Sequence, residues 1–190
     1  MQDINVAESS ISFLAYLGVK TLNVDQLFSL VDDDDLLVRT LVAQQLQKKA
    51  TRVVFDNVAE LAEDDRPFVR QTAIYIIGQL GLKERPYELE AISILLKLCN
   101  DESPSVRASA AAASGHNVLN HQMDSLVEKK LIELHTDNHE DVREGVAFAL
   151  GFSNSSDALE VLNKFKNDSS KSVMEYAEIS LETLATKGEK

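Results

Sequence analysis

The chain has 190 residues, 44% of them hydrophobic, and a formal net charge of −12. Such a charge repels nucleic-acid phosphates, so we expect no nucleic-acid partner. With seven glycines and three prolines, the sequence has too few turn residues for an all-β fold. Tryptophan is absent, and helix-forming residues are abundant. The single cysteine, Cys99, excludes an intrachain disulfide, and its apolar neighbours predict core packing.

The start of the chain carries no sign of export. Residues 1–5 lack the basic segment and the long apolar stretch of a secretory signal. No apolar run approaches the roughly 18 residues that a membrane span requires. We therefore expect a cytoplasmic monomer without membrane contact.

Amphipathic segments alternate along the chain with polar clusters that are typical of turns. The segment at residues 6–17 is expected to be an N-terminal cap or a degenerate half-repeat, because it lacks the repeated pattern described next. Five later segments are each expected to be the first helix of a pair: residues 24–31, 52–61, 87–99, 122–134 and 156–165. A second helix is expected after each of them.

A Val-Arg pair recurs in each expected second helix, every 31 to 37 residues. The copies are Val38-Arg39, Val69-Arg70, Val106-Arg107 and Val142-Arg143, with a degraded fifth copy at Val173-Met174. Five residues before each valine stands an aspartate: Asp33, Asp64, Asp101, Asp137 and Asp168. Three or four residues past the arginine position stands an alanine: Ala43, Ala73, Ala110, Ala147 and Ala177. Self-similarity at this period indicates stacked helical repeats.

The repeated charges have a structural interpretation. Each aspartate ends a turn, where its carboxylate can accept backbone N–H groups at the start of a helix. Each arginine can then bridge the aspartate of its own repeat or that of an adjacent repeat, and a bidentate contact of this kind would hold the repeats in register. The predicted ladder comprises Asp33, Arg39, Asp64, Arg70, Asp101, Arg107, Asp137, Arg143 and Asp168.

This pattern, followed by Leu-Gly, resembles HEAT repeats, especially the short bacterial type related to phycobilin-lyase HEAT-like repeats. The segment 141–151 carries the clearest match, segment 72–81 supports it, and the resemblance extends over residues 23–186. It implies an all-α fold, a right-handed α–α superhelix of about five helix pairs with an N-terminal capping helix. Two departures are the alanine-rich segment 110–114 and Met174, which replaces the fifth arginine.

The same resemblance sets the expected domain organisation. One repeat domain is expected over residues 1–190, with a cap at 1–22 and a frayed tail at 187–190. The repeats are expected at residues 23–50, 51–82, 83–119, 120–153 and 154–186.

In HEAT-like folds the second helices line the concave side, so the resemblance implies that positions one, five and nine past each arginine face solvent. Four of these positions carry aromatic rings, which are common anchors in protein interfaces. With their polar neighbours they form the predicted partner-binding set: Gln71, Tyr75, Gln79, His116, Glu144, Phe148 and Phe152.

The sequence contains no recognisable catalytic or metal-binding motif. It has no phosphate-binding glycine loop, no nucleophile elbow and no His-Glu-x-x-His pattern. The His and Cys spacings do not match zinc sites, and the acidic run at 32–35 lacks the alternating ligands of a calcium loop. We predict no catalytic residue, metal or cofactor.

The functional prediction is a non-enzymatic module that binds a protein partner on its concave face. One version is an inhibitor or immunity-type protein that neutralises a basic partner, because opposite charge speeds association. The resemblance leaves open a HEAT-like enzyme of the bilin-lyase or DNA-repair glycosylase type, although the negative charge is the wrong sign for a glycosylase groove. A structural adaptor or scaffold in a larger assembly is the remaining alternative.

Overall fold

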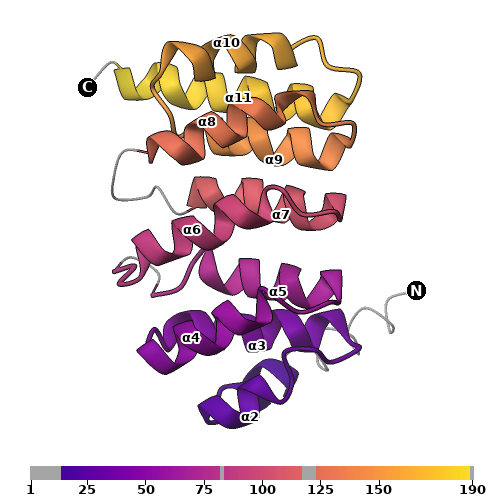
Figure 1. Cartoon of the computed structure of the whole chain (residues 1–190), viewed down its shortest axis with the longest axis vertical. Helices are drawn as coiled ribbons and strands as arrows, with labels where there is room; N and C mark the ends of the chain where they lie inside the picture. The colour runs from indigo at the N-terminus through magenta and orange to yellow at the C-terminus, as the bar shows by residue number, and fades with distance from the viewer. Residues whose placement is uncertain (1–13, 82–83, 117–122, 189–190) are drawn as a thin grey trace. The chain divides into compact units, whose positions relative to one another are not determined.

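In the computed structural model, the described residues are 14–81, 84–116 and 123–188, and their regular secondary structure is entirely helical (Figure 1). They divide into two compact units, Met1–Pro86 and Tyr87–Lys190, called the N-terminal and C-terminal units below. The division falls a few residues after the predicted boundary between the second and third repeats. The expectation of one single domain stays a prediction.

The N-terminal unit contains four helices after a short helical segment at residues 14–19; the rest of the predicted cap helix lies outside the described residues. The four are α2 (Val24–Phe28), α3 (Leu36–Lys48), α4 (Arg52–Leu61) and α5 (Pro67–Ile77). Side-chain oxygens cap three of their starts: those of Asn23, Asp35 and Thr51. The fourth, α5, begins with Pro67, whose missing N–H costs nothing at that position.

Side chains from α3, α4 and α5 form the core of the N-terminal unit. Leu46, Val54, Val58 and Ile74 are almost completely buried there. The helices α3 and α5 pack together, as do α4 and α5. The Val-Arg helices α3 and α5 are therefore neighbours, as the repeat pattern requires.

The described residues of the C-terminal unit form three helix pairs. The first helices are α6 (Glu88–Leu98), α8 (Ser125–Glu133) and α10 (Ser156–Phe165), and the second helices are α7 (Pro104–His116), α9 (Glu140–Leu150) and α11 (Lys171–Gly188). A 3-10 turn, η1 (Leu134–Thr136), joins α8 to the loop before α9. The helix α11 extends to Gly188 and so includes residues 187 and 188 of the expected tail, whose fraying stays a prediction. That segment contains no proline that would stop the helix.

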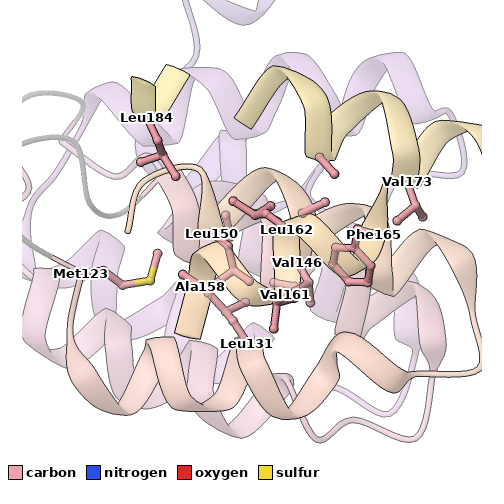
Figure 2. Packing of buried hydrophobic residues seen from close by; sticks show 14 of the residues in the cluster. Met123, Leu131, Val146, Leu150, Ala158, Val161, Leu162, Phe165, Val173 and Leu184 are labelled. Carbon is pink, nitrogen blue, oxygen red and sulfur yellow. The ribbon is translucent and has the colours of Figure 1, made fainter. Parts of the chain in front are cut away.

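Within the C-terminal unit, the first helices pack against one another and so do the second helices, which produces two layers. The core lies between the layers and includes the buried residues Leu131, Val146, Leu150 and Leu162 (Figure 2). Burying each leucine stabilises the fold by about 1.5–3 kcal/mol relative to exposure. This core holds the second helices in place and so positions their outer face.

The second helices α7 and α9 approach each other closely because small residues line their contact. A Cβ atom on Gly145 would lie 2.7 Å from the carbonyl oxygen of Ala108, and a Cβ atom on Gly115 would lie 2.8 Å from the Cα of Ala149. The alanine-rich sequence of α7, a departure from the HEAT pattern, therefore coincides with tight packing. The predicted all-helical repeat fold is confirmed.

Among the described residues, no helix combines the length and the apolar composition that crossing a membrane requires.

Candidate functional site

An aromatic cluster lies on the second-helix layer of the C-terminal unit. Phe148 of α9 is its centre. The centroid of the Phe148 ring lies 4.9 Å from that of His116 at the end of α7, 5.3 Å from that of Phe152 and 6.4 Å from that of Tyr176 on α11. The contacts with Phe152 and Tyr176 are edge-to-face, a favoured geometry for aromatic rings. Three consecutive second helices thus contribute to one cluster.

The four rings are not equally accessible. Tyr176 is 36% exposed, whereas His116, Phe148 and Phe152 are half-buried. Phe152 also packs against the hydrophobic core of the unit. The cluster therefore supports the fold and at the same time presents aromatic surface to solvent, with Tyr176 as its most exposed ring.

A carboxylate lies one helical turn from the rings. Glu144 precedes Phe148 by four residues on α9, and Ser172 precedes Tyr176 by four residues on α11. Residues four apart share one face of a helix. The Ser172 hydroxyl donates a hydrogen bond to Oε2 of half-buried Glu144, so this pair bridges α9 and α11 beside the Phe148–Tyr176 contact.

Three members of the predicted binding set belong to the N-terminal unit. Tyr75 on α5 is 39% exposed, and Gln71 and Gln79 are half-buried. The backbone carbonyl of Tyr75 accepts a 2.6 Å hydrogen bond from Nε2 of Gln47 on α3. None of these three residues is among the four rings of the aromatic cluster.

Tyr176 belongs to the cluster, although sequence reasoning did not select it. It stands two residues past Met174, whereas the predicted solvent-facing positions are one, five and nine past the arginine position. Its ring reaches Phe148 because α9 and α11 lie side by side. The signal in the sequence that could have identified Tyr176 was its aromatic side chain on an amphipathic second helix, α11.

In the C-terminal unit, two arginines each bridge one repeat to the aspartate of the next. The Nε and Nη2 atoms of Arg107 donate to the two carboxylate oxygens of Asp137 at 2.9 and 3.1 Å. Arg143 contacts Asp168 in the same bidentate way, with both distances 2.8 Å. The Nη1 atom of each arginine donates to the backbone carbonyl of the aspartate that precedes it, Asp101 or Asp137.

These contacts change the acidity of the aspartates. Burial raises the pKa of Asp137, but hydrogen bonds from the Arg107 side chain and the His139 backbone outweigh burial, and the pKa is lowered. The Arg143 hydrogen bond is the main cause that lowers the pKa of Asp168. Both carboxylates are therefore ionised at neutral pH, as charge-assisted pairing requires.

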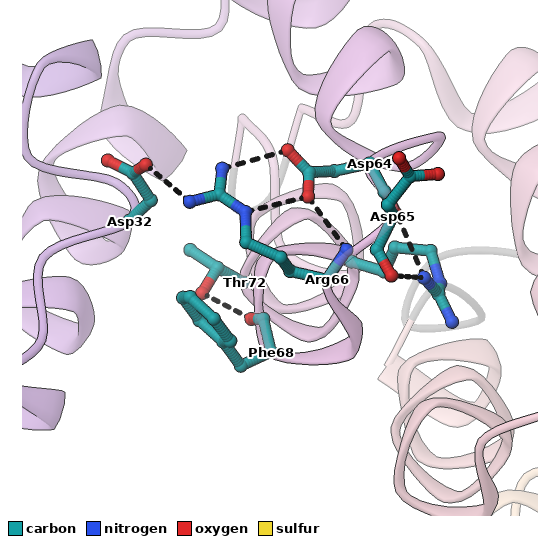
Figure 3. A network of polar contacts seen from close by, with 7 residues as sticks. Asp32, Asp64, Asp65, Arg66, Phe68 and Thr72 are labelled. Carbon is teal, nitrogen blue, oxygen red and sulfur yellow. Dashed lines mark hydrogen bonds and ion pairs between the residues drawn. The ribbon is translucent and has the colours of Figure 1, made fainter.

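In the N-terminal unit, Arg66 contacts two aspartates (Figure 3). Its Nε and Nη2 atoms donate to Asp64 at 2.9 Å each, and its Nη1 atom donates to Asp32 at 2.9 Å. The hydrogen bond from Arg66 lowers the pKa of Asp64 to about 2. The sequence pattern did not select Arg66, because it lies outside the repeated offset.

The predicted ladder arginines of the N-terminal unit donate to backbone carbonyls. The Nη1 atom of Arg39 contacts the carbonyl oxygen of Asp33 at 2.5 Å, and that of Arg70 contacts the carbonyl oxygen of Asp64 at 2.8 Å. The Arg39 guanidinium also lies 5.1 Å from the centre of the Phe68 ring. Each of these arginines thus donates a hydrogen bond to the backbone of the turn before its own helix.

Helix pairs that repeat an Asp and a Val-Arg at fixed offsets match a known family. The family model described as HEAT repeats matches residues 24–115 and again 92–182. The chain belongs to the HEAT-repeat family. The HEAT-repeat fold is typical of protein-interaction modules.

The chain is similar to protein YibA of Escherichia coli strain K12, with 27% identity over 169 residues. That match covers 87% of this chain and spans 60% of the length of YibA. The X-ray structure of YibA from E. coli has a TM-score of 0.53 and 23% identity, and the match covers 93% of this HEAT-repeat chain and 78% of that one.

A designed armadillo repeat protein, solved in complex with the peptide (KR)4, is also similar. The TM-score is 0.63 with 20% identity, and the match covers 96% of this chain and 93% of the designed protein. At this identity the similarity concerns the fold alone. The fold by itself does not determine a function, so the functional argument depends on the residues of the site.

The described part of this HEAT-repeat chain contains no group of three or more His, Cys, Asp or Glu residues placed to hold a metal ion. Cys99 is buried, and burial raises the pKa of its thiol to about 12. A thiol in this state is a poor nucleophile, because the thiolate is the reactive form.

Proposed function

We propose that this HEAT-repeat protein is a non-catalytic interaction module that binds a protein partner through the aromatic cluster on α7, α9 and α11. The observation that carries this proposal is the convergence of rings from three consecutive second helices, with Tyr176 36% exposed. Aromatic side chains supply large contact area at low conformational-entropy cost, which is why they anchor many interfaces. In the HEAT-like arrangement this layer is the concave side.

The proposed partner has a basic surface. A net charge of −12 attracts cationic proteins and raises their rate of encounter. The designed armadillo protein that shares the fold was solved with a peptide of alternating lysine and arginine, so a fold of this kind can hold a basic peptide. An inhibitor or immunity-type role towards such a partner is one specific form of the proposal. A HEAT-like enzyme and a structural adaptor remain alternative hypotheses. The identity of the partner would distinguish between them.

The test is affinity capture with three versions of the full chain: wild type, a Phe148→Leu/Tyr176→Ser double variant, and a Leu89→Ser control. Leucine at position 148 keeps apolar packing beneath the cluster, and Leu89 is an exposed apolar residue on α6, outside the second-helix layer. Circular dichroism and thermal melting would first establish that all three are folded.

We expect the wild type and the Leu89→Ser control to capture the same protein and the double variant to lose it. Hydrogen exchange of the purified complex should then protect α9 and α11. Equal capture by all three versions, or protection confined to other helices, would place the interface elsewhere and refute the proposal.

A further inference from the structure

The surface next to the aromatic cluster contains a fixed carboxylate. Glu144 is half-buried, and its Oε2 atom accepts the hydrogen bond from Ser172. Within the described residues, its Oε1 atom has no hydrogen-bond partner. The Ser172 contact limits the rotamers of Glu144, so a ligand that binds Oε1 would meet a carboxylate already held in position.

The carboxylate and the rings are close enough to contact one side chain of a partner. Four residues of helix correspond to a rise of about 6 Å. The Glu144–Ser172 contact therefore lies about that far along the helices from the Phe148–Tyr176 contact. A planar cation that donates to a carboxylate and lies against aromatic rings within about 6 Å matches this spacing.

Two basic side chains of α9 and α11, Arg143 and Lys171, have carboxylate partners. Arg143 donates to Asp168, and the Nζ atom of Lys171 lies 3.0 Å from Oε1 of Glu175. The outward face of α9 also carries exposed Glu140, one turn before Glu144. The local charge is therefore negative, and it complements a positively charged ligand.

We infer that the partner inserts an arginine side chain at Glu144, Phe148 and Tyr176. The guanidinium donates to Oε1 of Glu144 and packs against the Phe148 and Tyr176 rings. Arginine suits this place better than lysine, because its planar group stacks on rings while its N–H groups remain free for a carboxylate. This inference rests on the proposed function and names the chemistry by which the same site selects its partner.

The inference can be tested with fluorescein-labelled octapeptides of alternating sequence, (Ala-Arg)4, (Ala-Lys)4 and (Ala-Glu)4, by fluorescence anisotropy with the full chain. The variants are Glu144→Gln, Tyr176→Leu and, as a matched control, Glu178→Gln. Glu178 is exposed on α11 but two residues from Tyr176, which places it about 200° around the helix. The two glutamate variants therefore remove the same charge from different faces.

We expect (Ala-Arg)4 to bind saturably and more tightly than (Ala-Lys)4, and (Ala-Glu)4 not to bind. Glu144→Gln should weaken (Ala-Arg)4 binding about tenfold and Tyr176→Leu about threefold to tenfold, because each removes one half of the contact. Glu178→Gln should change affinity less than about twofold, since an exposed distant charge contributes little.

Three results would overturn the inference: no binding of (Ala-Arg)4, equal losses in Glu144→Gln and Glu178→Gln, or (Ala-Lys)4 binding as tightly as (Ala-Arg)4. The capture experiment separates these failures from failure of the proposed function. A partner that is captured by wild type and lost by the double variant, without arginine-peptide binding, would refute the arginine contact and leave the interaction face in place. If neither the capture result nor the arginine-peptide binding is obtained, both the proposed function and the arginine contact are refuted.

Discussion

Arg107 makes contacts in two directions. One edge of its guanidinium donates to the Asp137 carboxylate in the following repeat, and Nη1 donates to the carbonyl oxygens of Asp101 and Glu102 in the turn before its own helix. The side chains of Arg107 and Asp137 are only 16% and 10% exposed. Partial burial strengthens such contacts and makes an unpaired partner costly.

Replacing Arg107 with alanine should therefore lower the free energy of unfolding by about 1–3 kcal/mol, because Asp137 keeps its charge and loses its main partner. Urea denaturation followed by circular dichroism measures this. The control is Arg52→Ala, which removes an ion pair with Asp56 in which the side chains are 59% and 51% exposed. That variant should change stability by less than about 0.5 kcal/mol. Equal effects in the two variants would remove the structural role assigned to the Arg107 contact.

The Arg143–Asp168 contact predicts that the stability of the folded chain depends on pH. The folded-state pKa of Asp168 is lowered, mainly by the Arg143 hydrogen bond, so the carboxylate is more acidic in the folded than in the unfolded chain. The stabilisation is complete above the pKa of an unfolded aspartate, about 3.9, and is lost as pH falls through the lower folded-state value.

We expect the difference in unfolding free energy between wild type and Arg143→Ala to be constant from about pH 5 to 7 and to shrink below about pH 4. Urea denaturation at a series of pH values measures this difference. Other carboxylates titrate in both proteins, so the comparison isolates the arginine contact. A difference that stays constant down to about pH 2 would show that Asp168 is not the partner that matters.

The packing of α7 against α9 depends on the absence of side chains at two glycines. Gly145 faces the backbone of α7, with Ala111 and Ala112 also close to the position that its Cβ would take. Backbone atoms cannot rotate away as a flexible side chain can. The close approach of these helices also brings His116 to Phe148, so the geometry of the aromatic cluster depends on this helix contact.

Gly145→Ala should lower the free energy of unfolding by about 1–3 kcal/mol, because the helices must separate to admit a methyl group. Intrinsic helix propensity alone predicts the opposite, a gain of about 1 kcal/mol for alanine. Gly18→Ala is the matched control, since no atom of the described residues beyond its own stretch of helix lies within 4 Å of its added Cβ. Thermal and urea denaturation of both variants would decide between packing and propensity, and a stabilised Gly145→Ala would contradict the tight contact.

Helix positions were predictable where amphipathic periodicity was strong. The predicted segments 52–61 and 156–165 coincide with α4 and α10, both capped by a side-chain hydroxyl. The segment 24–31 was predicted too long, since α2 ends at Phe28. After Phe28 the chain continues in turns with hydrogen bonds between residues three apart, and these keep apolar Val31 buried outside regular helix. Burial of an apolar residue therefore does not require helix at this point in the chain.

The candidate site was less predictable than the helices. Spacing along one chain identified Phe148 and His116 as members of an outward row, but it could not show that Tyr176 meets Phe148 across two helices. It likewise could not show that Arg66 contacts Asp64, because a regular offset describes what repeats share and Arg66 is present once. Side-chain contacts between helices depend on helix rotation, which periodicity alone does not determine.

At the scale of the whole molecule, the charge of −12 should act mainly on the rate of association. Charges spread over the surface attract a cationic ligand at long range, and salt screens this attraction within a Debye length of about 8 Å at 0.15 M ionic strength. Contacts in the bound complex are shorter and are screened less. The two kinetic constants should therefore respond differently to salt.

Stopped-flow anisotropy with (Ala-Arg)4 tests this difference. Raising the ionic strength from about 0.02 M to about 0.15 M should lower the association rate constant several-fold and change the dissociation rate constant less. Sucrose at matched viscosity controls for slower diffusion. An association rate constant that does not respond to salt would show that the overall charge does not steer binding.

The two-directional contacts of Arg107 and Arg143 also bear on how such a chain can lengthen. Each arginine takes its carbonyl acceptor from its own repeat and its carboxylate acceptor from the next one. After an in-frame duplication of one such repeat, every arginine would still have a carbonyl acceptor in its own repeat and a carboxylate acceptor in the next. The new copy would supply a further arginine and a further aspartate. The repeat at residues 154–186 has Met174 in place of the arginine, so it lacks the side chain that would bridge to an aspartate of a following repeat.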